Sequence, residues 1–172
     1  TIDSKTKNYI MKYGYLLKNL SNSRKREELD KIFASKNKDI GKKLILELKL
    51  DKYLGLDNLE EVVMCDDILG IWSQIKLSID YPFTKVEKDM IKKIKMMLSG
   101  PVNKITIYKY GLYVSTVVGS IRGISYQKIN AIYKSLAIYT KKDIVVNGMD
   151  ICNKLNILPD SRIKDIRIMK RV

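Results

Sequence analysis

Apolar residues recur every three or four positions along most of this chain, and this period most constrains its fold. Between Thr6 and Leu20 they form a stripe typical of one face of an amphipathic helix. The stripe consists of Tyr9, Ile10, Tyr13, Leu16, Leu17 and Leu20. Only three prolines and nine glycines occur, too few for an architecture of many strands and turns. The pattern therefore predicts a nearly all-α fold of helices joined by short loops.

Capping residues and breaks divide the remaining chain into further short helices. Ser21, Asn22 and Ser23 favour helix caps and separate the first helix from one that runs through Phe33. Thr84 and Glu87 have capping-box spacing ahead of an apolar stripe. We also expect helices over about 38–48, around 69–75, over about 102–110 and 112–121 on either side of Gly111, after Gly123 through Leu136, over 149–156, and from Pro159 onward.

The size and composition indicate a globular protein. No apolar run approaches the roughly 18 residues that a membrane span needs, so we expect no membrane partner. Cys65 and Cys152 lie far apart and form no CxxC pair. They are predicted to be buried thiols in a reducing cytoplasm, because no secretory leader is evident. The abrupt start and end suggest a portion of a longer protein.

The sequence contains no histidine, which excludes Ser-His-Asp triads, Cys-His pairs and His-ligated zinc sites. A two-metal site needs carboxylates that converge. Adjacent carboxylates such as Asp66 and Asp67 diverge by about 100° on a helix, so they are predicted to be solvated surface. We therefore expect no catalytic and no metal site in this chain.

Basic residues are in large excess and are unevenly distributed. The 33 Lys and Arg against 19 Asp and Glu give a formal net charge of +14. Residues 1–46 carry 12 basic and 5 acidic side chains, residues 47–84 carry 3 and 8, and residues 85–172 carry 18 and 6. Such a segregated surplus favours a polyanionic partner. The alternative is that the lysines merely solvate helix faces.

Two blocks of the sequence resemble the bacterial class II tRNA nucleotidyltransferases, which comprise CCA-adding enzymes and bacterial poly(A) polymerases. The first block consists of Thr6, Leu20-Ser21, Arg24, Arg26, Glu28-Leu29 and Lys31-Ile32. The second consists of Leu136-Ala137-Ile138, Asp143-Ile144, Asn147 to Ile151, and Pro159 to Ile166. Departures occur at Ser23, Lys25, Asp160-Ser161 and Lys164, where the family has Glu, Ile and glycines.

The resemblance implies an elongated array of short helices. It assigns residues 1–50 to neck helices, 51–136 to a helical body and 137–172 to an incomplete tail. It further implies that the chain holds tRNA while a missing N-terminal head, with Mg²⁺ and CTP or ATP, adds CMP and AMP to the 3′ end. Arg24, Arg26 and Glu28 would support the nucleotide site from the neck, and the chain alone would be inactive.

Candidate RNA contacts follow from residues that can reach phosphates or lean on a sugar or base. The first group is Lys141, Lys142, Tyr139 and Asn147, and the second is Arg122, Lys128 and Lys134. Exposed loop and solvated helix face are the alternatives. The eleven tyrosines are too scattered to predict a stacking platform. Arg24 and Glu28 are four residues apart, which predicts an intrahelical ion pair.

Two other functions remain open from the sequence. A stand-alone helix-turn-helix regulator would use the same basic surplus to bind DNA. A peripheral membrane or protein-interaction domain would use its basic faces, although no helix shows the Trp- and Phe-rich apolar side typical of a bilayer surface.

Overall fold

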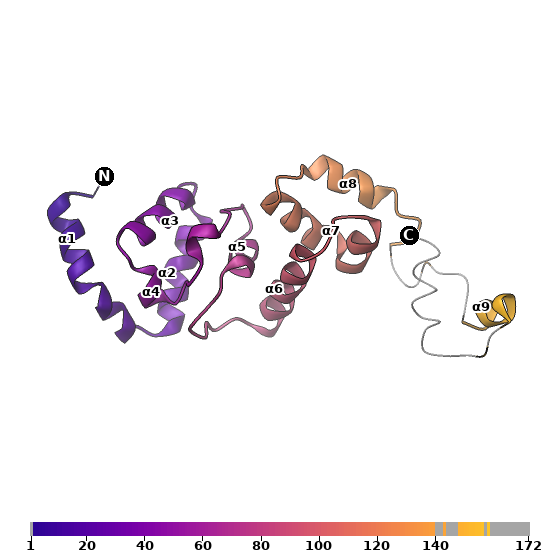
Figure 1. Ribbon diagram of the computed structural model, residues 1–172, viewed down its shortest axis with the longest axis horizontal. Helices are drawn as coiled ribbons and strands as arrows, with labels where there is room; N and C mark the ends of the chain where they lie inside the picture. The colour runs from indigo at the N-terminus through magenta and orange to yellow at the C-terminus, as the bar shows by residue number, and fades with distance from the viewer. Residues whose placement is uncertain (1, 140–142, 144–147, 157, 159–172) are drawn as a thin grey trace. The chain divides into compact units, whose positions relative to one another are not determined.

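The computed structural model describes residues 2–139, 143, 148–156 and 158, and within these residues the fold is all-α (Figure 1). Its extended pairing in this part is limited to one isolated antiparallel bridge between Leu56 and Leu77. Among the described helices, none combines the length and apolar character needed to cross a membrane. The predicted fold class is confirmed.

The chain divides into two compact units, Thr1–Lys95 and Met96–Val172. The division falls inside the helix α6 (Lys85–Leu98). The boundaries predicted from the resemblance, after residues 50 and 136, stay predictions. Cys65 in the first unit and Cys152 in the second are both buried.

The first unit consists of short helices, some of which begin at a side-chain cap. In chain order they are α1 (Ser4–Tyr13), η1 (Gly14–Asn19), α2 (Asn22–Ala34), α3 (Lys38–Glu47), α4 (Asp51–Leu54), η2 (Leu59–Glu61), α5 (Ile68–Gln74) and the first part of α6. The side chain of Ser21 accepts a hydrogen bond from the Arg24 amide, 3.2 Å away, and begins α2 as predicted. The capping box before α6 is also confirmed: Thr84 N donates to Glu87, and Glu87 N donates to Thr84 Oγ1.

The single helix predicted over residues 6–20 is wrong beyond Tyr13, because the chain tightens into the 3-10 helix η1 at Gly14. Gly14 is buried, and a Cβ there would lie 2.8 Å from Leu50 Cδ2 and 3.4 Å from the Tyr53 ring. Glycine permits this close packing of η1 on α4. Its low helix propensity also weakens the α-helix at this point, by about 1 kcal/mol relative to alanine.

Aromatic rings form the centre of the first unit. Trp72 packs against Phe33 at 5.2 Å, Tyr81 at 4.9 Å and Phe83 at 5.3 Å between ring centroids. The Trp72 indole donates to Asp30 Oδ1 at 2.6 Å, and the Tyr81 hydroxyl donates to the Leu54 carbonyl at 2.6 Å. Burial raises the pKa of the Tyr81 phenol. The polar atoms of both rings are thus satisfied within the core.

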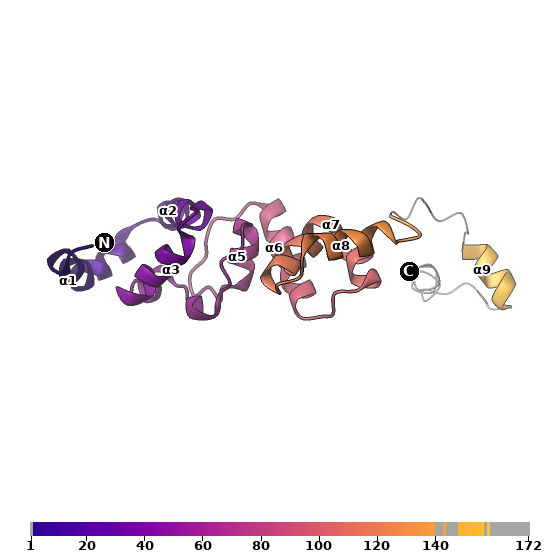
Figure 2. The ribbon, with the colours of Figure 1, turned by 90° about the horizontal axis from the view of Figure 1, so that it is seen from above.

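The second unit contains α7 (Lys104–Ile121), α8 (Tyr126–Lys134) and α9 (Gly148–Leu155). Gly111 interrupts α7 with φ 82° and ψ 169°, so two helical runs meet there as predicted. Figures 1 and 2 both show α8 next to α7, and the two helices contact each other. The helix predicted over 149–156 is confirmed as α9, whereas the helix predicted from Pro159 lies outside the described residues.

Candidate RNA-binding surface

The N-terminal helices carry lysines and tyrosines on their exposed side. Helix α1 contains no buried residue, and the rings of Tyr9 and Tyr13 stack 6.1 Å apart at an interplanar angle of 13°. Both tyrosines are exposed. Lys12 Nζ lies 5.3 Å from the centroid of the Tyr13 ring. This arrangement leaves cationic and aromatic groups together in solvent.

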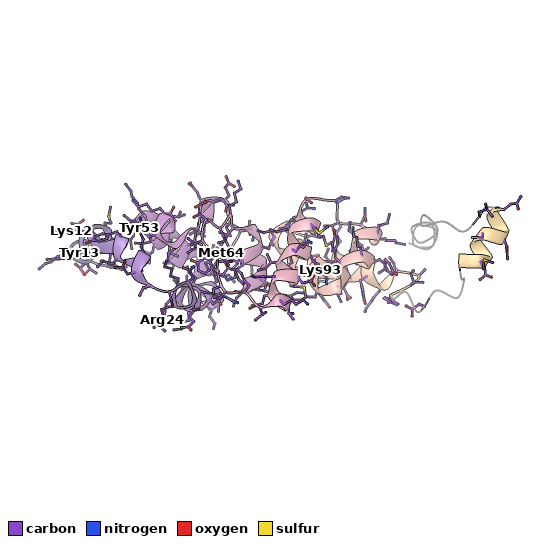
Figure 3. The ribbon with its side chains drawn as sticks, turned by 90° about the horizontal axis from the view of Figure 1, so that it is seen from below. Lys12, Tyr13, Arg24, Tyr53, Met64 and Lys93 are labelled. Carbon is purple, nitrogen blue, oxygen red and sulfur yellow. The ribbon has the colours of Figure 1, made fainter. Side chains whose placement is uncertain are left out.

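A second contact of the same kind joins η1 to α4. Lys18 Nζ lies 5.7 Å from the Tyr53 ring centroid, and Lys52 Nζ lies 4.8 Å from it. Figure 3 shows Lys12, Tyr13 and Tyr53 at the end of the unit formed by the first helices. We call Tyr9, Lys12, Tyr13, Lys18, Lys52 and Tyr53 the lysine–tyrosine surface. Cations there can bind phosphates, and exposed rings can contact bases or sugars.

Sequence reasoning missed this surface. The neighbouring pairs Lys12-Tyr13 and Lys52-Tyr53 are visible in the sequence, but Lys18 reaches Tyr53 only because η1 packs on α4 at Gly14. The tyrosines were expected to be too scattered for a stacking platform, and that stays a prediction: Tyr9 stacks on Tyr13, whereas Tyr53 contacts Lys18 and Lys52.

Arg24 and Glu28, two residues of the predicted neck element, lie on the exposed side of α2. Arg24 forms ion pairs with Glu27 at 3.1 Å and Glu28 at 2.9 Å, which confirms the predicted intrahelical pair. Lys31 bonds Glu28 at 3.0 Å and is the main cause that lowers the pKa of this carboxyl. Exposed pairs of this kind contribute little stability.

Arg26, the third residue of that element, has a different environment. Its guanidinium donates to both carboxylate oxygens of Glu87 and, at 2.6 Å, to the carbonyl of Pro82. It also lies 4.5 Å from the Phe83 ring centroid and pairs with Asp30 at 3.3 Å. The hydrogen bond from Arg26 is the main cause that lowers the pKa of Glu87 to about 2. Arg26 therefore ties α2 to the start of α6, and its role toward a nucleotide stays a prediction.

The predicted RNA contact Arg122 bonds its own fold. Its guanidinium donates to the carbonyl of Leu98 at 2.5 Å and to that of Gly100 at 2.8 Å. Leu98 is the last residue of α6, where carbonyls lack intrahelical partners, and Gly100 follows the helix. Arg122 thus satisfies the end of that helix, and its side chain remains exposed.

The other predicted RNA contacts of the second unit do not lie on one face of a helix. Lys128 and Lys134 are both exposed on α8, but six residues separate their directions by about 120° around a helix. Tyr139 contacts the Tyr133 ring at 5.2 Å, and its amide donates to Asp143 at 2.9 Å. Lys141, Lys142 and Asn147 lie outside the described residues.

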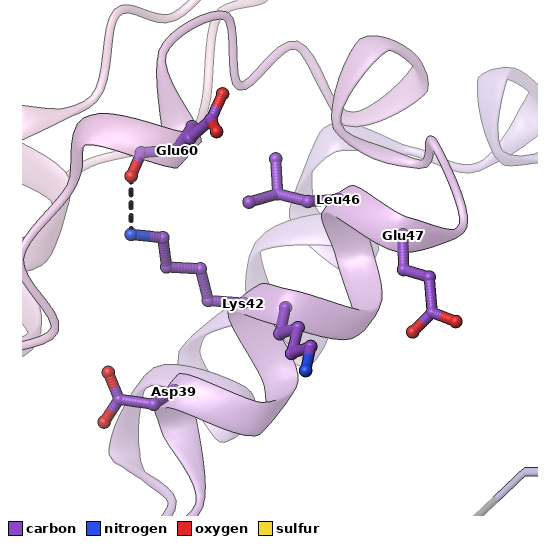
Figure 4. A pocket seen from close by; sticks show the side chains of 6 residues that line it. Asp39, Lys42, Leu46, Glu47 and Glu60 are labelled. Carbon is purple, nitrogen blue, oxygen red and sulfur yellow. Dashed lines mark hydrogen bonds between the residues drawn. The ribbon is translucent and has the colours of Figure 1, made fainter.

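A shallow pocket on α3 is unsuited to phosphate (Figure 4). Asp39, Lys42, Lys43, Leu46, Glu47 and Glu60 line it. Lys42 Nζ donates to the carbonyls of Glu60 and Val62, each at 2.7 Å. The lining thus contains three carboxylates but only two lysines, one of which already binds carbonyls, so the pocket does not favour an anion.

Within the part of the chain that the structure describes, no group of three or more Asp, Glu or Cys residues could hold a metal ion. These residues offer no site that fits Mg²⁺.

Comparisons with known proteins agree with the RNA-binding character of the basic surplus. Residues 1–58 match a family model described as the probable RNA- and SrmB-binding site of polymerase A. A CCA-adding enzyme from Streptococcus uberis is 25% identical over 187 residues, covering 91% of this chain. The resemblance to the CCA-adding enzyme and poly(A) polymerase family is confirmed. This chain spans about half of the CCA-adding enzyme, 46% of its length, and the lysine–tyrosine surface lies within the segment that matches the polymerase A model.

Proposed function

We propose that this chain is the tRNA-binding, C-terminal portion of a CCA-adding tRNA nucleotidyltransferase. The match of residues 1–58 to an RNA-binding model carries the proposal, and the similarity to a CCA-adding enzyme supports it. The coarser conclusion, an RNA-binding portion of this family, rests on the same two matches. The excess of 33 Lys and Arg over 19 Asp and Glu complements the RNA backbone.

In the complete protein, a part outside this sequence would add CMP and AMP to the 3′ end of the tRNA held here. Mg²⁺ and CTP or ATP would bind to that part. The partners are then tRNA and the rest of the polypeptide, and the setting is the cytoplasm. Alone, the chain is expected to bind tRNA and leave its 3′ end unchanged.

Filter binding of tRNA and of duplex DNA with the same number of phosphates, at two salt concentrations, tests the proposal. We expect tighter binding of tRNA at both concentrations, because shape and 2′-hydroxyl contacts add to the common phosphate attraction. Equal affinity for both nucleic acids contradicts the proposal.

A DNA-binding helix-turn-helix module is the second candidate, and the second unit provides the observation that favours it. The run of α7 after Gly111 and helix α8 are joined by a short turn in which Gly123 has φ 69°. Short glycine-containing turns are typical of that motif. Tighter binding of the duplex DNA in the same experiment would favour this candidate.

A further inference from the structure

Four lysines form a continuous stripe on α6. Lys85, Lys88, Lys92 and Lys95 are all exposed. At about 100° of rotation per residue, they fall within an arc of about 80°. The first and last are ten residues apart, which corresponds to about 15 Å along the helix.

No ion pair joins these four lysines to any described residue. The two acids of α6 are engaged elsewhere: Glu87 binds Arg26, and Asp89 pairs with Lys93 at 2.7 Å. Like charges three and four residues apart repel each other. Lys85 and Lys88 also lie near the positive end of the helix dipole. The isolated helix therefore carries four charges that destabilise it and that nothing in the described fold compensates.

The rest of α6 holds the stripe toward solvent. Ile94 and Met97, on the opposite side, are fully buried, and the capping box and the Arg26–Glu87 contact fix the start of the helix. A membrane surface does not suit this helix, because its apolar side already packs in the protein core.

We propose that Lys85, Lys88, Lys92 and Lys95 form a phosphate track, along which one strand of the bound RNA lies. The proposal rests on the proposed function and names four residues of this chain that would contact the RNA. Several phosphates of one strand fit along about 15 Å, given one phosphate per about 3.4 Å of axis in a duplex strand. Lysine contacts of this kind attract the backbone without reading bases.

The salt dependence of tRNA binding by the full chain tests the track. Each phosphate contact contributes about 0.7–0.9 to the slope of log K against log salt. We expect the fourfold variant Lys85→Gln, Lys88→Gln, Lys92→Gln, Lys95→Gln to reduce the slope by about 3. The fourfold arginine variant keeps the charges and should retain the slope.

Lys92 and Lys93 provide a matched pair of single variants. They are neighbours on α6, and Lys93, labelled in Figure 3, points about 100° away from Lys92 and is paired with Asp89. Lys92→Gln should reduce the slope by about 0.7–0.9, whereas Lys93→Gln should leave it unchanged. Circular dichroism should show all variants folded, because each fourfold variant keeps the buried side of α6.

Three outcomes overturn the track: an unchanged slope in the fourfold glutamine variant, equal effects of Lys92→Gln and Lys93→Gln, or a lost slope in the arginine variant. A lysine-dependent dimer in light scattering without RNA would also overturn it, since an acidic segment of a second copy would then be the occupant. Failure of the proposed function is distinct, because it appears as a lack of preference of the wild-type chain for tRNA over duplex DNA.

Discussion

Arg24 and Arg26 lie two residues apart on α2, but their surroundings differ. The Arg24 side chain is 58% exposed and binds carboxylates of its own helix. The Arg26 side chain is 15% exposed and contacts α6 and the turn before it. The resemblance assigns both arginines to the same neck element, but the geometry gives the larger structural role to Arg26.

We predict that Arg26→Ala lowers the free energy of unfolding by about 2–3 kcal/mol, because it leaves Glu87 and Asp30 without their cation. Arg24→Ala, the matched control, should cost less than about 0.5 kcal/mol. Urea titration followed by Trp72 fluorescence measures both values, since Trp72 is the single tryptophan of the sequence. Equal effects of the two variants would contradict this assignment.

Glu87 predicts an acid-dependent loss of stability. Its pKa of about 2 lies below the ordinary value of 4.5, so its contribution is complete above about pH 4.5 and is lost as the pH falls toward 2. We expect Glu87→Gln to cost about 2 kcal/mol at neutral pH, after allowance for solvent screening. The difference between wild type and variant should shrink between pH 4.5 and 2 in urea titrations. A difference that stays constant over this range would show that Glu87 does not titrate as described.

The distance along the chain decides which of these contacts sequence can predict. Arg24 and Glu28 are four residues apart on one helix, so helical spacing alone predicts their pairing. Arg26 and Glu87 are 61 residues apart, and their contact depends on how α2 and α6 pack. No local pattern contains that information.

At the scale of elements, Gly111 offers a test of backbone strain. Its φ of 82° and ψ of 169° belong to a region that glycine alone adopts readily, and a Cβ there would meet no atom within 4 Å. We predict that Gly111→Ala destabilises α7 by about 1–3 kcal/mol through the backbone alone. Hydrogen exchange of the α7 amides measures the loss.

Gly100 is the control for this prediction. It also has open space for a Cβ, and its φ is not in the left-handed range. Gly100→Ala should therefore leave α7 exchange unchanged. If both substitutions raise exchange equally, the strain at Gly111 is not the cause.

The starts of α2 and α6 were predictable, and the shape of the first helix was not. Ser21 and the Thr84–Glu87 pair cap their helices through neighbouring atoms, which a sequence pattern captures. The change at Gly14 depends on Leu50 and Tyr53, almost forty residues later. The same packing brings Lys18 to Tyr53. Sequence reasoning therefore missed the lysine–tyrosine surface as well.

At the scale of the whole molecule, Lys141 and Lys142 stay predicted tRNA contacts of the tail. We expect the double variant Lys141→Ala, Lys142→Ala to weaken tRNA binding and to reduce the salt slope by about 1.5, because each lysine would lose one phosphate contact. Filter binding over a salt series measures the slope. An unchanged slope would count against the assignment of this segment to tRNA binding.

The position of α6 has a practical consequence for dissecting the protein. The chain divides between Lys95 and Met96, but α6 continues to Leu98, and the amide of Gly100 still bonds the carbonyl of Met97. A truncation placed at the division would remove the final turn of a helix and leave earlier carbonyls without their amide donors. Expression of an N-terminal piece for binding studies should therefore end after Gly100, outside the helix.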